Sequence, residues 1–390
     1  MQSKDFNPDK LELSTLTIHS DKNAYVGKIY DVAPPLHVST TYRASLGDDD
    51  VYFYTREARH PTRDRTEAVL GSLYHPSAAV TYSSGLAAVH AALLHYTPRR
   101  VAIRGGYFGI HNVLRLYRRT SDLQIIDIDD ELQENDLVII ESPQNPSGEI
   151  FDIEHYARRA HEAKAKLFVD ATFGPPPLQD PFKQGADMVF HSTTKFLAGH
   201  SDALGGALFV KSKEEAHKLI EDRSVVGSVP GNLESWLLLR SLRTLPLRVT
   251  QQTRTATALI QWLSLASEGR AHDGIPGGTI RSVLHASIQK SADAYRDRQM
   301  PGGYGAVFSI VLYTKELAKM LPHCTQLLTP ATSLGGAESL IEWRYPLDKT
   351  LDPGLVRVSI GLEGLEDLKN DFRHALLEAE KRVKKQADAN

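Results

Sequence analysis

A lysine that follows a short apolar run has the clearest chemical potential in this sequence. Residues 188–190 read as a buried strand, and small hydroxyl residues lead from them to Lys195. A lysine at the end of a buried strand loses part of its hydration, which lowers the pKa of its ammonium group. Its free amine can then attack an aldehyde. Most lysines are solvated surface residues, so the weight of this interpretation depends on the neighbours of Lys195.

The aldehyde cofactor that uses such a lysine is pyridoxal phosphate, which also needs a carboxylate, a phosphate cup and a ring-stacking aromatic side chain. Asp170 ends an apolar run, at the edge where open α/β sheets bind ligands. The turn 83–85, Ser-Ser-Gly, precedes a helical segment whose free N–H groups attract phosphate. Tyr107 follows a strand and two glycines. Each has an ordinary reading as well: a cap, an α/β turn and a core aromatic.

The elements that must position these residues alternate from about residue 79 to 210, which predicts a mostly parallel, doubly wound α/β sheet. From Leu233 the pattern predicts one long amphipathic helix, followed by a smaller α+β region with strands near 306–312 and 356–360 and a closing helix at 365–384. We therefore expect a large cofactor-binding domain at 51–245 and a C-terminal α+β domain at 246–390.

Residues 1–50 are predicted to form an N-terminal arm, because Gly27, Pro34, Pro35 and the acidic trio at 48–50 break any long period. An arm without its own core lies on another surface. In a homo-oligomer we expect that surface to be the neighbouring subunit.

Composition restricts the partners. The chain has 390 residues, 41% of them hydrophobic, and a net charge of −3, with basic and acidic residues interspersed. Such a chain has no concentration of positive charge that would bind nucleic acid or an anionic membrane, so we expect small-molecule partners. The single cysteine, Cys324, forms no internal disulfide, and neither a signal sequence nor a membrane-length apolar run is visible, so we expect a cytoplasmic location.

Taken together, the motifs resemble the cystathionine γ-synthase-like, or Cys/Met-metabolism, branch of fold-type I pyridoxal phosphate enzymes. The resemblance implies an aspartate aminotransferase-like transferase fold, with pyridoxal 5'-phosphate as cofactor. The similar segments run in the family's order and are Tyr54-Thr-Arg56, Pro61-Thr-Arg63, Ser83-Ser-Gly85, Tyr107-Phe-Gly109, Glu141-Ser-Pro-Gln-Asn145-Pro, Val169-Asp170-Ala-Thr172-Phe173, and those at 191–202, 333–340 and 357–363.

The resemblance also implies roles. Lys195 would form the Schiff base and move protons, Asp170 would face the pyridinium nitrogen, and Tyr107 would stack on the ring and assist catalysis. The implied cofactor-binding residues are Tyr54 and Arg56 from the adjacent subunit, with Gly85, Leu86, Tyr107, Asn145, Asp170, Thr172, Ser192, Thr194 and Lys195. The implied substrate-binding residues are Ser333, Arg357, Asn145 and Tyr54. No metal site is expected, and relatives of this kind are homotetramers built from active dimers.

Several positions depart from the family pattern. Ala171 stands where Asn is usual, His60 replaces the usual Asn, Thr332 stands where cystathionine-handling enzymes often have Glu, and Gly109 occupies the place of a cysteine frequent in methionine γ-lyases. Residues 341–345 replace a common Met-Thr-His segment. These positions cluster where the second substrate or the leaving group should lie, which indicates altered specificity with retained chemistry.

Three functions follow as hypotheses. The first is γ-replacement on an activated homoserine such as O-acetyl-L-homoserine, through a vinylglycine ketimine, with a thiol or a stabilised carbon nucleophile. The second is elimination by a cystathionine- or methionine-type γ-lyase or a β-lyase, which yields an oxo-acid and ammonia. The third is a non-catalytic protein that keeps the fold. The retained lysine, aspartate and arginine disfavour the third, and the changes at Thr332 and Gly109 favour replacement.

Overall fold

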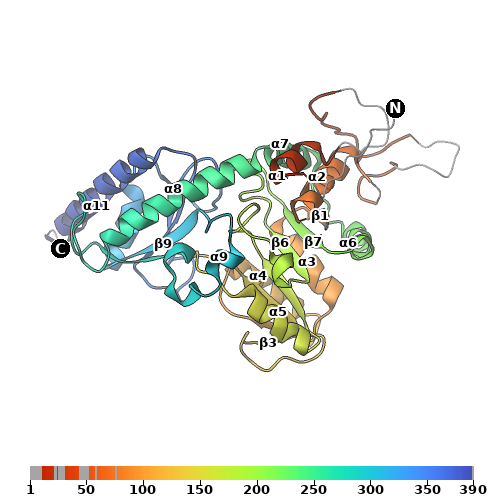
Figure 1. Ribbon diagram of the computed structural model, residues 1–390, viewed down its shortest axis with the longest axis horizontal. Helices are drawn as coiled ribbons and strands as arrows, with labels where there is room; N and C mark the ends of the chain where they lie inside the picture. The colour runs from red at the N-terminus through yellow and green to blue at the C-terminus, as the bar shows by residue number, and fades with distance from the viewer. Residues whose placement is uncertain are drawn as a thin grey trace.

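The computed structural model describes residues 11–21, 24, 31–43, 52–57, 59–74 and 77–388. Two sheets are built from different parts of this chain, a seven-stranded one from residues 78–210 and a five-stranded one from residues 280–359. Figure 1 shows the long helix α8 (Leu245–Leu265) extending from the region of the first sheet to the C-terminal region, where it packs beside α11 (Leu365–Asp388).

The larger sheet has the strand order β1-β7-β6-β5-β4-β2-β3. Only β7 runs antiparallel to its neighbours, so the predicted mostly parallel sheet is confirmed. The strands are β1 (Ala78–Tyr82), β2 (Arg100–Ile103), β3 (Gln124–Ile126), β4 (Leu137–Glu141), β5 (Lys166–Asp170), β6 (Met188–His191) and β7 (Gly206–Val210).

Successive residues of the central strands contribute to different cores, because side chains alternate between the two faces of a strand. In β5, for example, Leu167 and Val169 belong to one cluster of buried apolar residues and Phe168 belongs to the other. Helices therefore cover both faces of the sheet. They are α2 (Pro61–Gly71), α3 (Gly85–Tyr96), α4 (Phe108–Tyr117), α5 (Ile153–Glu162) and α6 (Lys213–Val226), with short 3-10 turns η2 (Ser72–Tyr74) and η3 (Pro181–Gln184).

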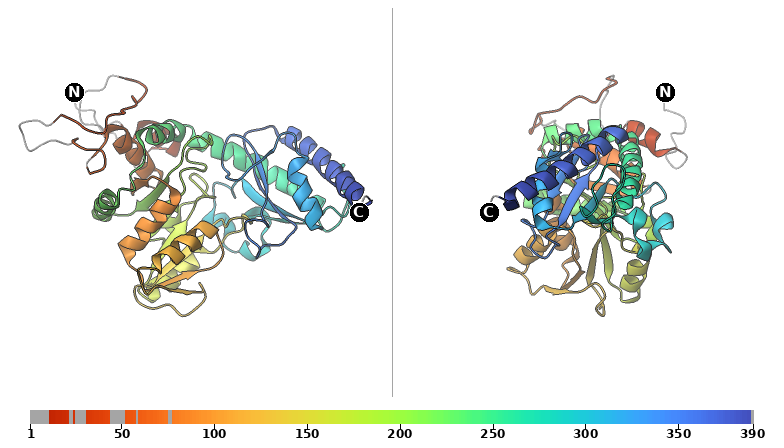
Figure 2. Two further views of the ribbon diagram at one scale, coloured as in Figure 1. Left: turned by 180° about the vertical axis from the view of Figure 1, so that it is seen from behind. Right: turned by 90° about the vertical axis from the view of Figure 1, so that its left-hand side faces the viewer.

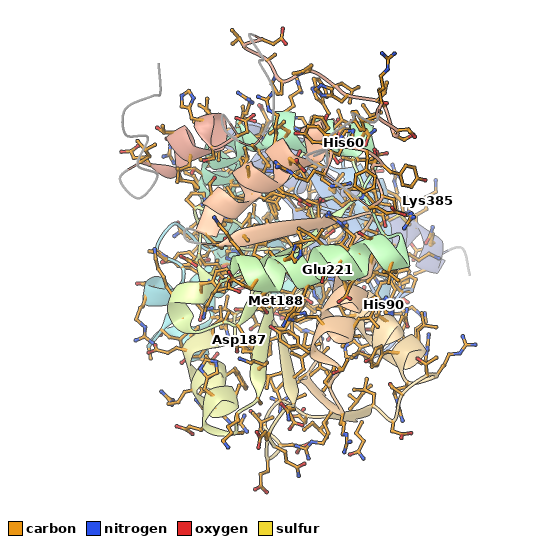
Figure 3. All side chains as sticks on the ribbon, turned by 90° about the vertical axis from the view of Figure 1, so that its right-hand side faces the viewer. His60, His90, Asp187, Met188, Glu221 and Lys385 are labelled. Atoms are coloured by element: carbon orange, nitrogen blue, oxygen red, sulfur yellow. The ribbon has the colours of Figure 1, made fainter. Side chains whose placement is uncertain are left out.

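Helices α3 and α6 pack against each other on one side of the molecule. Figure 3 faces that side, with His90 on α3 and Glu221 on α6. None of the helices in the described part of the chain combines the length and apolar character needed to cross a membrane.

The smaller sheet has the order β10-β11-β12-β9-β8, and the first two strands are its only parallel pair. The expected strands near 306–312 and 356–360 are present as β9 and β12, whereas β8, β10 and β11 were not predicted. Figure 2 shows this sheet beside α8 and α11. Its elements are β8 (Ile280–Leu284), η4 (Ala286–Ile288), η5 (Lys290–Ala292), α9 (Arg296–Gln299), β9 (Val307–Leu312), α10 (Lys315–Met320), η6 (Leu321–His323), β10 (Thr329–Pro330), β11 (Leu340–Trp343) and β12 (Leu355–Ser359).

The prediction of one long helix from Leu233 is wrong. The chain forms α7 (Asn232–Leu242) and then α8, separated at Thr244, whose φ of −115° and ψ of 8° are not helical. Pro246 explains the break, because a proline lacks the N–H that a continuing helix needs but is tolerated in the first turn of a new one.

The predicted N-terminal arm is not extended throughout. Residues Leu13–His19 form helix α1, which packs against α2, η2 and α8 of the same chain and buries Leu16. Gly27 and residues 48–50, on which part of the prediction rested, lie outside the described residues. Contact of the arm with a neighbouring subunit, and the division of the chain at residue 245, stay predictions.

Candidate functional site

The candidate site is a cavity of about 430 Å³ at the carboxyl edge of the larger sheet. Parallel strands end there, and the loops that follow them carry side chains into the same space. Strands β11 and β12 of the smaller sheet, and the loop between β10 and β11, also line the cavity. The predicted residues that line it are Gly85, Leu86, Tyr107, Asn145, Asp170, Thr172, Ser192, Thr194, Lys195, Ser333 and Arg357.

Lys195 lies where the sequence predicted, a few residues after β6. Its Nζ donates a hydrogen bond of 2.8 Å to Ser333 Oγ. Burial, and to a smaller extent the nearby positive charge of Arg357, lower the pKa of Lys195 to about 8. The lowered pKa increases the fraction of the amine that is unprotonated at neutral pH, which is the form that attacks an aldehyde.

Asp170 ends β5 with its carboxyl group almost completely buried. Burial raises its pKa to about 6, while the Thr172 N–H, 2.9 Å from Oδ1, acts against that rise. A cationic ring nitrogen beside Asp170 would stabilise the ionised carboxylate in this buried position. The side chain therefore suits the predicted partner of a pyridinium N–H.

The first turn of α3 offers a place for a phosphate. The Ser84 hydroxyl caps the helix by accepting from the Ala87 N–H at 3.1 Å, and Gly85 and Leu86 follow as the first helical residues. A side chain at position 85 would stand 3.3 Å from Ser192 Oγ, so glycine keeps this cradle open. Free N–H groups and neighbouring hydroxyls fit a phosphate monoester. With Lys195 and Asp170, this set of residues fits pyridoxal phosphate.

Arg357 is held in a dense network at the wall of the cavity. Its Nη1 donates to Asn145 Oδ1 at 3.1 Å, and its Nη2 donates to the Ser333 carbonyl oxygen at 2.9 Å and to Glu342 Oε2 at 2.7 Å. Burial lowers the pKa of Arg357 to about 10, so the guanidinium stays charged at neutral pH. This position suits the predicted clamp for a substrate carboxylate.

Tyr107 lines the cavity next to Phe108, and 38% of the residue is exposed. By contrast, the structure does not bring Tyr54 or Arg56 into the cavity of the same chain. Arg56 donates to the Ser224 carbonyl oxygen at 2.9 Å and pairs with Glu57 instead. Their predicted roles therefore need a second subunit and stay predictions.

Three charged cavity residues were not among the predicted site residues. Glu141 accepts from the Asn145 and Tyr107 N–H groups at 2.7 and 2.6 Å, which ties two loops of the site together; burial and Asp170 raise the pKa of its carboxyl group. Glu342 and Arg344 lie on and just after β11. Glu342 and Arg344 are two residues apart, so their side chains lie on the same face of an extended chain. This spacing, next to the apolar Leu340-Ile341, was a signal for a strand, but the strand was not predicted.

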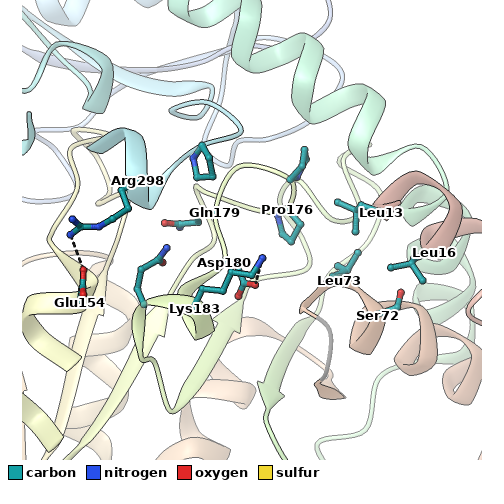
Figure 4. Close-up of a pocket in the computed structure, with 13 residues that line it drawn as sticks. Leu13, Leu16, Ser72, Leu73, Glu154, Pro176, Gln179, Asp180, Lys183 and Arg298 are labelled. Atoms are coloured by element: carbon teal, nitrogen blue, oxygen red, sulfur yellow. Dashed lines mark ion pairs between the residues drawn. The ribbon is translucent and has the colours of Figure 1, made fainter. Parts of the chain in front are cut away.

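A second cavity, of about 490 Å³, lies away from these residues between α1, η2, η3 and α9 (Figure 4). Its charges are largely paired: Arg298 with Glu154 at 2.7 Å and Lys183 with Asp180 at 3.5 Å. None of the predicted site residues lines it. Among the described residues, no group of three or more His, Cys, Asp or Glu side chains is arranged to hold a metal ion.

Comparisons with known proteins agree with the geometry. A family described as "Cys/Met metabolism PLP-dependent enzyme" matches residues 14–377. Cystathionine beta-lyase MetC of Bacillus subtilis is 30% identical over 94% of this chain and 96% of its own length. L-methionine gamma-lyase of Brevibacterium aurantiacum is 34% identical over 87% of this chain and 83% of its own.

Solved structures of related proteins share the architecture. The structure of metB from Corynebacterium glutamicum superimposes with a TM-score of 0.86 at 28% identity, covering 96% of this chain and all of that one. Cystathionine gamma synthase from Xanthomonas oryzae pv. oryzae, in complex with cystathionine, gives a TM-score of 0.84 at 28% identity and covers 95% of this chain and 99% of its own. The expected fold and cofactor are thereby confirmed.

Proposed function

The chain belongs to the Cys/Met metabolism family of pyridoxal phosphate-dependent enzymes, and from that premise we propose that it catalyses γ-replacement on O-acetyl-L-homoserine. When bound, the cofactor supplies an electron sink for negative charge on substrate carbons. Lys195 takes the Cα proton and then a Cβ proton, and the acetoxy group leaves Cγ as acetate. A thiol or a stabilised carbon nucleophile then bonds to Cγ and gives up its own proton, and Lys195 returns protons to Cβ and Cα.

One arrangement carries the proposal: the amine of Lys195 and the guanidinium of Arg357 both bond to Ser333, on its hydroxyl and its carbonyl oxygen respectively. A substrate α-carboxylate bound at Arg357 would therefore hold its Cα within reach of the proton-transferring amine. Tyr107 is placed at the mouth of the same cavity, where its phenol can assist departure of the leaving group.

The choice of replacement over elimination rests on the outer part of the cavity. Thr332 lines it without adding a charge. At position 109, a β-carbon would collide with Cε1 of the Tyr107 ring, so glycine is required while the ring keeps this orientation. A cysteine at that place, as in many methionine γ-lyases, would require the Tyr107 ring to take another orientation. We propose that the altered outer cavity admits a separate nucleophile.

Elimination is the second candidate, because relatives of comparable identity carry both kinds of name. These include the cystathionine beta-lyase and L-methionine gamma-lyase above and a "Cystathionine gamma-synthase/O-acetylhomoserine (thiol)-lyase" of Bacillus subtilis that is 30% identical over 88% of this chain. The shared early steps use the same residues, so the outcome depends on whether a nucleophile reaches Cγ.

Product analysis separates the two. The cofactor-loaded protein is incubated with O-acetyl-L-homoserine alone and then with cysteine, sulfide or a β-keto acid, and products are identified by mass spectrometry. We expect a new amino acid whose mass includes the added nucleophile. If 2-oxobutyrate, ammonia and acetate are the only products under every condition, the protein is a lyase and the proposal is wrong.

We also propose that the active unit is a dimer within a homotetramer.

A further inference from the structure

Two arginines in the cavity share a single carboxylate. Glu342 lies directly opposite Arg357 in the β11–β12 register. Its Oε2 accepts from Arg357 Nη2 at 2.7 Å and from Arg344 Nη1 at 2.7 Å. The side chains are 14%, 5% and 5% exposed for Glu342, Arg344 and Arg357, and all three line the cavity that contains Lys195. Together they carry one net positive charge.

The hydrogen bonds of Arg357 leave no free position for bidentate binding of a carboxylate. A carboxylate that accepts two N–H groups from a guanidinium uses Nη2 together with either Nη1 or Nε. The two N–H groups of Arg357 Nη2 already serve the Ser333 carbonyl oxygen and Glu342. The first of these partners belongs to the backbone, so an incoming carboxylate displaces the side chain of Glu342.

Displacing Glu342 would be costly if no other cation held it, since a buried carboxylate without a partner is strongly unfavourable. Arg344 provides that cation at 2.7 Å from Glu342. The buried Nε–H of Arg344 has no hydrogen-bond partner among the described residues, so its guanidinium can donate a further hydrogen bond. An added α-carboxylate would also match the one net positive charge of the trio.

We propose that Glu342 occupies the carboxylate-binding position of Arg357 in the absence of substrate, and that the α-carboxylate of the amino-acid substrate replaces it there. Arg344 keeps its ion pair with Glu342 during this exchange. Arg344 is thus a positioning residue that favours ligands with an α-carboxylate. The inference depends on the proposed function only in taking Arg357 as the carboxylate clamp. It does not depend on replacement or elimination.

The alternative is that Glu342 only orients Arg357. A pair of ligands without a γ leaving group separates the two: L-norvaline has an α-carboxylate, and n-butylamine has the amine alone. Their dissociation constants are measured from the absorbance of the bound cofactor. Glu342→Gln should bind L-norvaline at least as tightly as the unchanged protein, because the competing carboxylate is gone. A merely orienting Glu342 would make the same variant bind more weakly.

Arg344→Met leaves Glu342 with no second cation, so we expect the dissociation constant for L-norvaline to rise about tenfold or more, equivalent to about 1.4 kcal/mol. The value for n-butylamine should stay within about twofold. Arg344→Lys keeps the charge and should stay within about threefold for both ligands. In the double variant Glu342→Gln/Arg344→Met, L-norvaline binding should return to near the original value.

The proposal is overturned if Arg344→Met leaves L-norvaline binding unchanged, if it weakens both ligands equally, or if the double variant binds no better than Arg344→Met. Weaker L-norvaline binding by Glu342→Gln would overturn it independently, even if Arg344→Met fails to fold. Arg357→Met serves as the reference for the clamp. If it does not weaken L-norvaline selectively, the assigned clamp is wrong, and product analysis still decides the reaction.

Discussion

Ser333 links the nucleophile to the carboxylate clamp. Its hydroxyl bonds to Lys195 and its carbonyl oxygen to Arg357, and its φ of 81° lies in the left-handed region that residues other than glycine rarely adopt. An unfavourable backbone conformation persists at a site when the side chain is needed there. We therefore expect stability and function to change in opposite directions when Ser333 is replaced.

Replacing Ser333 by Gly should raise the free energy of unfolding by up to about 1 kcal/mol and lower kcat about tenfold, because the strain is relieved and the Lys195 hydrogen bond is lost. Thr97→Gly is the matched control. Thr97 has a φ of 42° at the far end of α3 from the site, so this change should stabilise without affecting kcat. Denaturant unfolding and steady-state kinetics measure both effects. Full activity in Ser333→Gly would contradict the assigned role.

Lys195 should also show its lowered pKa in solution. The amine attacks an aldehyde only when unprotonated, and burial and Arg357 lower the pKa from 10.5 to about 8. The rate at which the cofactor-free protein takes up pyridoxal phosphate should therefore rise with pH through a midpoint near 8. In Arg357→Met a neighbouring positive charge is removed, so the midpoint should move to higher pH. A midpoint near 10.5 in the unchanged protein would show that Lys195 is not desolvated.

At the scale of elements, the start of α3 combines helix stability with anion binding. Ser84→Ala removes the cap on Ala87 and should lower the free energy of unfolding of the cofactor-free protein by about 1 kcal/mol. Ser212→Ala removes an equivalent cap, on Glu215 at the start of α6, and should have a similar effect on stability. Only Ser84→Ala should weaken pyridoxal phosphate binding. Equal cofactor affinities in the two variants would place the phosphate elsewhere.

The sequence predicted best the elements whose pattern is local. The strands that lead to Asp170 and Lys195 are short apolar runs, and both were located correctly because burial on both faces produces such runs. The strand β11 was missed since Glu342 interrupts its apolar character. That charge is explained by its ion pairs with Arg357 on the neighbouring strand and with Arg344. Pairing between distant segments leaves no local trace, so the shared carboxylate was not predictable.

At the scale of the whole molecule, the positions of Tyr54 and Arg56 bear on whether the cofactor site is formed by one subunit or by two. Tyr54 is 41% exposed, and neither residue lines the cavity of its own chain. The sequence resemblance assigns both to the phosphate of the adjacent subunit. A shared site explains their exposure, because the partner would cover them.

Mixing two inactive variants tests the shared site. Lys195→Ala and Arg56→Ala are each expected to have low activity, but a mixed dimer has one site with both native residues. Activity should therefore return when subunits exchange. Arg59→Ala is the control. It removes a different exposed arginine, which is paired with Asp64, so this variant should be active without mixing. No recovery after verified exchange would indicate that Arg56 does not act across subunits.

Binding of the cofactor in the cavity with Lys195 at its wall can be tested directly. Borohydride reduction of the pyridoxal phosphate-loaded protein fixes the cofactor to the lysine that binds it, and peptide mass spectrometry then identifies that lysine. We expect the added phosphopyridoxyl mass on the peptide that contains Lys195, and its absence from Lys195→Ala. Labelling of a different lysine, or no labelling of the protein in its coloured form, would show that the cofactor does not bind at Lys195.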